Sequence, residues 1–285
     1  MKKTVGVIGQ GFVGTAVKEG LSHSYKVQTY DISKDSTCRD LKELSQKSNY
    51  IFLCLPTPMK EDGSCDLGII KNVAFELDSY KKEKIMIIKS TVPPGTTEML
   101  NAECDHLKFV FNPEFLTEAN YLEDFKNQNR IIIGGPRPYS TKVKNLYRKA
   151  FSTIPIIKTH STIAEMVKYF TNCFLATKVS FANEIKQLCD ALSVDYDKVI
   201  EYSLYDERIG KTHLSVPGPD GSFGFGGSCF PKDLNALISE AIKKDINPMV
   251  LKSVWRKNLE VRPEKDWEEL KGRAISYKVK KGEVK

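Results

Sequence analysis

The residues of this chain best suited to chemistry lie in the stretch Gly224–Asp233, which reads Gly-Phe-Gly-Gly-Ser-Cys-Phe-Pro-Lys-Asp. Pro231 favours the first turn of a helix, because its missing N–H is not needed there. Cys229 is therefore expected at a helix N-terminus, where unpaired N–H groups and the nearby Lys232 favour the thiolate over the thiol. Asp233 follows one helical turn later on the same face. A lone cysteine is most often a small buried residue, but this loop, proline and carboxylate together predict a nucleophile beside an acid.

A glycine-rich loop near the start of the chain predicts a dinucleotide site. The apolar, β-branched run Thr4–Ile8 indicates a buried parallel strand, and it leads into Gly-Gln-Gly-Phe-Val-Gly at residues 9–14. A helical pattern follows, and then a second strand, Lys26–Tyr30, that ends at Asp31. An acid about 20 residues beyond the glycines binds ribose hydroxyls and repels a 2′-phosphate, so NAD is preferred over NADP. The alternative is a glycine turn in an unrelated α/β fold. The expected cofactor contacts are Gly9, Gly11, Phe12, Val13, Gly14 and Asp31.

Apolar runs separated by helical segments continue through the first half of the chain. They lie at residues 50–55, 85–89, 107–111 and 130–135. This alternation predicts a doubly wound, Rossmann-like parallel sheet. Ligands bind beyond the carboxyl ends of the strands in such sheets, so the polar residues at these ends are expected to converge on the cofactor. Alone, each could be a turn or cap residue. They are Thr57, Thr91, Glu114 and Glu118.

A long helix is predicted in the second half. Thr162 to Glu165 reads as a capping box, and helix-compatible sequence then runs without Gly or Pro to about Leu192. Roughly thirty residues at ~1.5 Å rise would span two domains. Lys168 and Asn172 share one face, where an ammonium and an amide could clamp an oxyanion, or could simply face solvent. Shorter helices are expected at 195–200, from Pro231 onward and at 248–261, and the Gly- and Pro-rich segment 205–228 is expected to bind a ligand.

The composition is that of an ordinary globular protein of two domains. The 285 residues carry a formal net charge of +7, but the lysines are scattered, so no nucleic-acid groove is expected. No apolar run approaches the ~18 residues of a membrane span. Seven cysteines, without a Cys-x-x-Cys pair, indicate neither a disulfide framework nor a metal site, and they favour a reducing, cytoplasmic location. The expected divisions are a nucleotide-binding domain at 1–158, a helical central domain at 159–260 and a C-terminal tail at 261–285.

The motifs together resemble the UDP-glucose/GDP-mannose dehydrogenase family over essentially the whole chain. In order, they are Gly9-x-Gly-x-x-Gly14, Ser90-Thr-Val-Pro-Pro-Gly95, Asn112-Pro-Glu-Phe-Leu-Thr-Glu118, Lys168-x-x-x-Asn172, Arg208-Ile-Gly210 and Gly224–Asp233. The resemblance implies an enzyme that oxidises the primary alcohol of a nucleotide sugar to a carboxylate. It also implies that two NAD molecules are used in succession and that the aldehyde is not released.

The resemblance implies a role for each motif residue. Cys229 would add to the aldehyde to give a thiohemiacetal, whose oxidation leaves a thioester that water hydrolyses. Lys168 and Asn172 would stabilise the oxyanions. Asp233, Thr91 and Glu118 would handle water and protons, and the first base is either Lys168 or a water held by Asp233. The implied substrate contacts are Glu114, Phe115, Leu116, Lys168, Asn172, Arg208, Phe225 and Gly226, and Thr57, Thr91, Glu118 and Lys232 join the cofactor contacts.

The resemblance also implies a homodimer or a larger homo-oligomer, with the long helix at the interface and Arg208 reaching the neighbour's substrate. Family members carry a third domain that grips the nucleotide, and the chain ends soon after residues 267–272, so a short form lacking that domain is expected. The leading hypothesis is oxidation of UDP-glucose to UDP-glucuronate. The alternatives are an NAD-binding partner subunit without turnover, a dehydrogenase of GDP-mannose or of a UDP-N-acetylhexosamine, and a two-electron hydroxyacid dehydrogenase, which needs no nucleophilic cysteine.

Overall fold

The computed structural model describes residues 3–277, so the end of the expected C-terminal tail lies outside the described residues. The chain divides into two compact units. The first comprises the chain up to Thr57 together with Leu67–Lys168, and the second comprises Pro58–Asp66 together with the chain from Tyr169 onward. The division falls inside the long helix, and the segment after residue 260 belongs to the second unit, as far as it is described.

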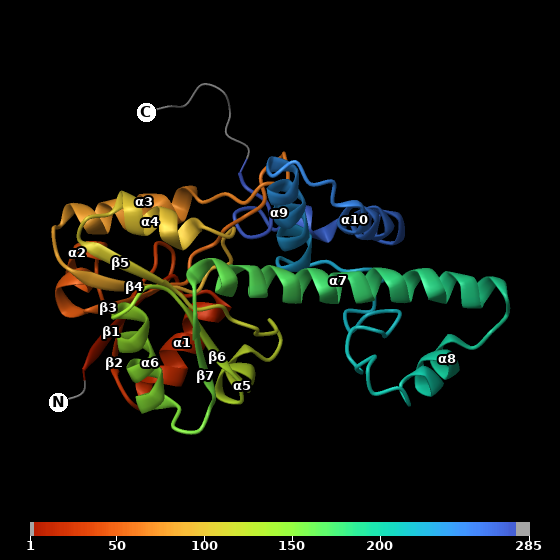
Figure 1. Cartoon of the computed structure of the whole chain (residues 1–285), viewed down its shortest axis with the longest axis horizontal. Helices are drawn as coiled ribbons and strands as arrows, with labels where there is room; N and C mark the ends of the chain where they lie inside the picture. The colour runs from red at the N-terminus through yellow and green to blue at the C-terminus, as the bar shows by residue number, and fades with distance from the viewer. Residues whose placement is uncertain (1–2, 278–285) are drawn as a thin grey trace. The chain divides into compact units, whose positions relative to one another are not determined.

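The first unit is built on a seven-stranded sheet of order β2-β1-β3-β4-β5-β6-β7 (Figure 1). Its strands are β1 (Thr4–Ile8), β2 (Lys26–Tyr30), β3 (Tyr50–Leu53), β4 (Lys84–Ile88), β5 (Leu107–Phe111), β6 (Ile131–Gly134) and β7 (Ile156–Thr159). The strands β1 to β5 pair in parallel. Their near-continuous apolar sequences fit strands that are buried on both faces.

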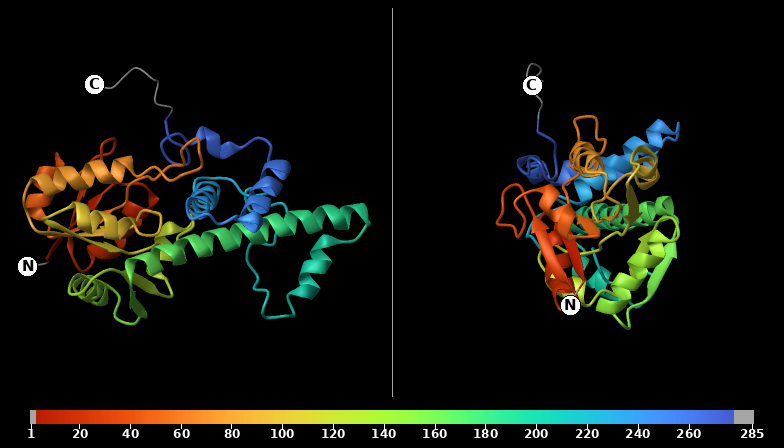
Figure 2. Two further views of the ribbon diagram at one scale, coloured as in Figure 1. Left: turned by 45° about the horizontal axis from the view of Figure 1, so that its top comes forward. Right: turned by 90° about the vertical axis from the view of Figure 1, so that its left-hand side faces the viewer.

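Helices cover both faces of this sheet (Figure 2). One face packs against α2 (Leu41–Lys47), α3 (Gly68–Ser79) and α4 (Thr96–Glu103), and the other packs against α1 (Phe12–Ser22), α5 (Tyr121–Lys126) and α6 (Tyr139–Ala150). Alternate residues of one strand serve the two cores: Ile51 and Leu53 belong to the first core, whereas Phe52 belongs to the second. The predicted doubly wound architecture is confirmed.

Two strands, β6 and β7, depart from the predicted parallel arrangement because both run opposite to β1–β5. Phe111 of β5 pairs with Gly134 of β6 in antiparallel orientation, and β7, which the sequence did not predict, pairs in parallel with β6. The only helix between β5 and β6 within the described residues is the short α5, whose Phe125 ring packs against Gly20 of α1. That helix lies beside α1 on the sheet face that α1 and α6 also cover, and β6 then enters the sheet in the direction opposite to β5.

The second unit is helical. It contains most of α7 (Ser161–Ala191), together with α8 (Tyr196–Ser203), α9 (Phe230–Lys243), α10 (Met249–Val261) and the short 3₁₀ helix η1 (Asp266–Glu269). The predicted long helix is confirmed at 31 residues. Trp267 is 1% exposed, and Met59 exchanges backbone hydrogen bonds with Ala274 and Ser276, which ties the segment Pro58–Asp66 to the end of the described chain. No helix within residues 3–277, not even α7, is both long enough and apolar enough to cross a bilayer.

The predicted capping box at the start of α7 is wrong. The helix begins at Ser161, so Thr162 lies inside it rather than at the N-cap. The Glu165 carboxylate does not return to its own helix start. It accepts hydrogen bonds from the Gly95 N–H at 2.6 Å and the Thr97 N–H at 2.8 Å. Glu165 therefore satisfies the first N–H groups of α4, a contact that local spacing could not reveal.

Candidate active site

The glycine loop has the backbone shape that a dinucleotide requires. Gly9 adopts a φ of +89°, and a Cβ there would lie 2.3 Å from the Cys54 carbonyl oxygen. A Cβ on Gly14 would lie 1.8 Å from the Gly9 carbonyl oxygen, whereas one on Gly11 would meet nothing within 4 Å. Gly11 is the N-cap of α1 and provides no side-chain cap. The first N–H groups of α1, beginning at Phe12 and Val13, are therefore available to a pyrophosphate.

Asp31 lies where a ribose-binding acid is expected, at the end of β2 beside this loop. Its Oδ2 accepts a hydrogen bond from the Gln10 N–H at 2.6 Å, and its Oδ1 accepts one from the Ser33 N–H at 2.9 Å. Partial burial alone would raise the pKa of Asp31, but these hydrogen bonds outweigh burial and the pKa is lowered. The carboxylate is therefore ionised at neutral pH and fits NAD better than a phosphorylated ribose.

The loops after β3 and β4 meet, as predicted from their positions in the sheet. The Thr57 hydroxyl donates to the Thr91 carbonyl oxygen at 2.7 Å, and both residues are buried. The Ser90 hydroxyl donates to the Leu55 carbonyl oxygen at 2.6 Å. The hydroxyl of Thr57 thus joins the two loops.

Glu114 and Lys168 form a buried ion pair. The Lys168 Nζ lies 2.9 Å from the Glu114 Oε1 and 2.7 Å from the Glu114 carbonyl oxygen, and the Leu116 N–H donates to the Glu114 Oε2 at 2.7 Å. The Phe115 ring centroid lies 5.5 Å from the same Nζ. Burial alone would raise the pKa of Glu114, but the Lys168 charge outweighs burial and the pKa is lowered. By contrast, Glu118 lies in an exposed turn.

A second buried lysine beside this pair escaped the sequence analysis. Lys89 is 3% exposed, and its Nζ donates to the Asn112 Oδ1 at 3.0 Å and to the Pro113 carbonyl oxygen at 3.3 Å. Burial lowers the pKa of Lys89 to about 8, although the Glu114 charge opposes that shift. The signal in the sequence was a single lysine directly after the apolar strand that becomes β4.

In the second unit, Asn172, Asp233 and Lys232 form a polar chain. The Asn172 Nδ2 donates to the Asp233 Oδ2 at 2.6 Å, and the Lys232 Nζ lies 2.5 Å from the Asp233 Oδ1. Asp233 is 1% exposed. Burial alone would lower the pKa of Lys232, but Asp233 and then Cys229 outweigh burial, so the pKa is raised. Asp233 therefore holds both an amide and an ammonium, and Lys232, predicted to contact the cofactor, pairs with this acid.

Cys229 lies at the start of α9, as predicted. It is the N-cap residue, Pro231 follows in the first turn, and the Asp233 N–H donates to the Cys229 carbonyl oxygen at 3.0 Å. Cys229 is partly exposed, whereas Cys173 of α7 is buried. The cysteine therefore begins the helical turn that carries Lys232 and Asp233, and Asp233 joins that turn to Asn172 of α7.

Side chains that are distant in sequence hold the loop before Cys229. Asn258, which is 0% exposed, accepts from the Phe225 N–H at 2.7 Å and donates to the Phe225 carbonyl oxygen at 2.9 Å. The Asn183 Oδ1 accepts from the Gly224 N–H at 3.1 Å. Asp266 accepts from the Gly227 N–H at 3.2 Å and pairs with Arg262 at 2.7 Å. The sequence analysis missed these residues, because amides and charges on helices carry no sign of a distant partner.

Three predicted substrate contacts have environments that limit what they can offer. The Phe225 ring packs at 5.9 Å from Phe230, inside the core of the second unit, and its backbone polar groups are bonded to Asn258. A Cβ at Gly226 would lie 2.4 Å from the Asp266 carboxylate, so that backbone is tightly enclosed. Arg208 is exposed and pairs with Asp206 in the loop after α8.

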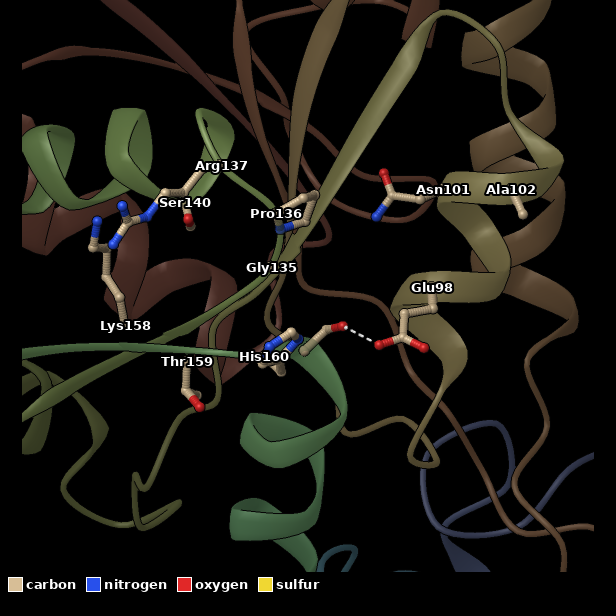
Figure 3. Close-up of a pocket in the computed structure, with 11 residues that line it drawn as sticks. Glu98, Asn101, Ala102, Gly135, Pro136, Arg137, Ser140, Lys158, Thr159 and His160 are labelled. Atoms are coloured by element: carbon tan, nitrogen blue, oxygen red, sulfur yellow. Dashed lines mark hydrogen bonds between the residues drawn. The ribbon is translucent and has the colours of Figure 1, made fainter.

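A cavity of about 770 Å³ in the first unit contains none of the predicted site residues (Figure 3). It lies among α4, the loop after β6 and the end of β7.

Comparison with known proteins identifies the family to which these residues belong. Residues 34–151 match the NAD binding domain of the UDP-glucose/GDP-mannose dehydrogenase family, and residues 162–260 match its central domain. UDP-glucose 6-dehydrogenase YwqF of Bacillus subtilis is 37% identical over 227 residues, which are 76% of this chain and 50% of YwqF. UDP-glucose 6-dehydrogenase AglM of Haloferax volcanii is 32% identical, with 87% of this chain and 67% of AglM covered.

A solved structure agrees with these matches. The UDP-glucose dehydrogenase of Pyrobaculum islandicum matches with a TM-score of 0.82 at 30% identity, over 95% of this chain and 71% of that chain. This chain spans about half the length of YwqF. The expected cofactor, NAD, is that of the matched N-terminal domain. With its NAD-binding and central domains both matched, the chain belongs to the UDP-glucose/GDP-mannose dehydrogenase family.

Proposed function

We propose that this protein oxidises UDP-glucose to UDP-glucuronate, with Cys229 as the covalent nucleophile. The observation that carries the proposal is that Lys232 and Asp233, on the first turn of the helix that Cys229 caps, form a polar chain with Asn172 of α7. A cysteine that only fills space has no need of a buried acid, amide and ammonium beside it. The names of YwqF and AglM support UDP-glucose as the substrate.

The cofactor would be held by the glycine loop and by Asp31. NAD supplies the hydride acceptor for each of the two oxidations. The uncapped start of α1 would bind the pyrophosphate, and the ionised Asp31 would accept hydrogen bonds from the ribose hydroxyls. The buried Thr57 and Thr91 would border the cofactor where the strands end.

The remaining residues would carry the covalent steps. The Cys229 sulfur adds to the C6 aldehyde, forming a C–S bond and an oxyanion that Lys168 and Asn172 stabilise. A second hydride loss leaves a thioester at Cys229. A water oriented by Asp233 then attacks the thioester carbon, the C–S bond breaks, and the thiolate and the carboxylate product are released. In balance, alcohol, water and two NAD give carboxylate, two NADH and three protons.

Lys168 enters this scheme as a charged group. Its pairing with Glu114 favours the ammonium form, which suits an electrostatic role. Glu114 would fix the direction of the amine and border the sugar, and Phe115 and Leu116 would line the same wall. Glu118 would exchange protons with solvent, since its turn is exposed.

The substrate is tested by following NADH formation. Purified protein is mixed with NAD and, separately, with UDP-glucose, GDP-mannose, UDP-N-acetylglucosamine and a small 2-hydroxy acid. The proposal predicts two NADH per UDP-glucose and little reaction with the others. One NADH per substrate would indicate a two-electron dehydrogenase. NAD binding without turnover of any substrate would indicate a partner subunit that lacks activity of its own.

We further propose that the protein works as a homodimer through the long helix. Phe170, Phe174, Phe181 and Leu188 recur at helical spacing on α7 and are 54–65% exposed. Soluble proteins seldom leave such a row of large apolar side chains uncovered. A second α7 would cover it, and Arg208 could then reach the neighbour's substrate. The seven cysteines, all within the described residues 3–277, form no disulfide, which agrees with the cytoplasmic location that we propose.

The dimer is tested by light scattering coupled to size exclusion. Wild-type protein is expected at twice the mass of the chain, and the double variant Phe174→Glu/Phe181→Glu is expected at the mass of one chain. A monomeric wild-type protein would contradict the dimer and leave the proposed chemistry standing.

A further inference from the structure

The cavity in the first unit has the size of a small-molecule site, and the proposed function does not use it. Its volume is about 770 Å³, and its walls come from α4, the loop Gly135–Arg137, the start of α6 and the end of β7 (Figure 3). Cavities that bind small molecules usually range from about 300 to 1,000 Å³. Its occupant can therefore be inferred from the groups that line it.

One side of the cavity carries positive charge without a carboxylate. Figure 3 shows the Arg137 and Lys158 side chains on the same side of the cavity. The Lys158 Nζ donates to the Thr141 hydroxyl oxygen at 2.9 Å. Neither cation has an acidic group within ion-pair distance among residues 3–277. Two cations on the same side of one cavity favour the binding of an anion there.

Ser140 supplies a second, independent sign of a ligand. The residue is 2% exposed and lines the cavity, yet its hydroxyl forms no hydrogen bond within the part of the chain that the structure describes. The Ser140 hydroxyl is not among the fully enclosed unpaired atoms of the described residues, so it opens into the cavity, where it is available to a ligand or to water. Ser140 also lies in the first turn of the 12-residue α6, which has no side-chain cap, and such a helix start favours an anion.

The opposite wall is suited to hydroxyl groups rather than to charge. The Glu98 carboxylate is held by Ser161 and Thr162, whose hydroxyls lie 3.3 Å and 3.0 Å from its Oε1. Its other oxygen can accept hydrogen bonds from a ligand. The Asn101 amide is hydrogen-bonded to the backbone of Thr97 and Phe109, so it lines the cavity without offering a free donor to a ligand.

We propose that this cavity binds a phosphorylated sugar or polyol. The phosphate would lie against Arg137, Lys158 and the Ser140 hydroxyl, and the hydroxylated part would extend toward Glu98. Arg and Lys together with a helix start form a strong phosphate site, since charge-assisted hydrogen bonds are about twice as strong as neutral ones. A cavity of this size exceeds the needs of inorganic phosphate alone.

Isothermal titration calorimetry on the full chain tests the proposal. Glucose 6-phosphate, inorganic phosphate and glucose are titrated separately with NAD present throughout, so that the cofactor site is filled. Glucose 6-phosphate is expected to bind more tightly than either fragment. The double variant Arg137→Gln/Lys158→Gln is expected to weaken its binding about tenfold or more. A control with the same charge change, Lys42→Gln/Lys144→Gln, is expected to leave binding unchanged.

Three results would overturn the proposal. They are equal affinity for inorganic phosphate and glucose 6-phosphate, equal weakening by the control variant, and unchanged affinity in the Arg137→Gln/Lys158→Gln variant. If that variant does not fold, the milder Ser140→Ala replaces it, with several-fold weaker binding expected. Amide NMR shifts of Ser140 and Ser161 on addition of glucose 6-phosphate give a second readout, and unmoved signals would contradict the site. None of these measurements depends on turnover, so they stand apart from the proposed dehydrogenase activity.

Discussion

Each unit of the molecule contains a buried lysine–carboxylate pair, and the two pairs differ in charge balance. In the second unit, Asp233 balances Lys232, and Asn172 completes its hydrogen bonds. In the first unit, Glu114 pairs with Lys168, and Lys89 adds a second buried amine that carries no carboxylate of its own. The first cluster thus has one carboxylate for two amines. Its net positive charge suits an oxyanion, whereas the balanced second cluster suits the positioning of a water and a thiol.

The comparison is tested most severely by removing each carboxylate. Glu114→Gln would leave two buried amines unbalanced, and removal of one partner of a buried pair costs about 3–5 kcal/mol. Asp233→Asn would leave only Lys232, so the loss should be smaller. Urea unfolding at pH 7 measures both losses. If Asp233→Asn were the more destabilising change, the assignment of excess charge to the first unit would fail.

Because of Lys89, the free energy of unfolding should change with pH in the alkaline range. Its pKa is about 8 when folded, against an ordinary value of 10.5. Between these values the unfolded chain binds a proton that the folded protein does not, so stability rises with pH across this window. The gain is roughly 3 kcal/mol and is lost as the pH falls through 8. Urea unfolding from pH 7 to 10.5 measures it, and Lys89→Met should remove the rise. An identical pH profile in the variant would contradict this.

Asn258 should control both the stability of the second unit and the reactivity of Cys229. Asn258→Ala leaves the Phe225 N–H and carbonyl unpaired in a buried place, which costs about 2–3 kcal/mol. A loosened loop should also slow the alkylation of Cys229 by iodoacetamide several-fold at pH 7, measured by peptide mass spectrometry.

Asn101→Ala is the matched control for that experiment. Asn101 bonds the backbone of Phe109 in the first unit through the same donor and acceptor pattern. The control should lose comparable stability and keep the wild-type alkylation rate at Cys229. Equal alkylation in both variants would show that Asn258 supports the fold without positioning the thiol.

Arg208 should show the smallest effect on the fold. Its pair with Asp206 is exposed, and exposed pairs contribute little. Arg208→Gln should leave the thermal midpoint unchanged in scanning calorimetry and raise the KM for UDP-glucose, since the proposed role of Arg208 is toward the neighbour's substrate. An unchanged KM would remove Arg208 from the substrate site.

Local sequence patterns were enough to predict much of the fold. Thr4–Ile8, Lys26–Tyr30 and Leu107–Phe111 are strands with the predicted bounds. Thr4–Ile8 and Leu107–Phe111 are mainly apolar, as buried parallel strands usually are. Strand β7 was missed, since its run is short and follows Pro155. Strand β6 was predicted at residues 130–135, but its antiparallel direction was not, because tertiary packing sets the direction in which a strand joins the sheet. Sequence patterning does not report that choice.

The residues of the candidate site were likewise predicted only in part. The glycine loop, Asp31, Cys229 and Asp233 were predicted because each belongs to a short motif with a mechanism. The contacts of Glu165 with α4 and of Asn258 with Phe225 join residues far apart in the chain. Such partners are fixed by tertiary packing alone.

The central claim is that Cys229 forms the covalent bond that carries the second oxidation, and it is tested by counting NADH. Wild-type protein and the Cys229→Ser variant are each given limiting UDP-glucose with excess NAD. We expect two NADH per UDP-glucose from the wild-type protein and no more than one from the variant, because a serine hydroxyl is a much weaker nucleophile than a thiolate. Two NADH from the variant at the wild-type rate would contradict the account.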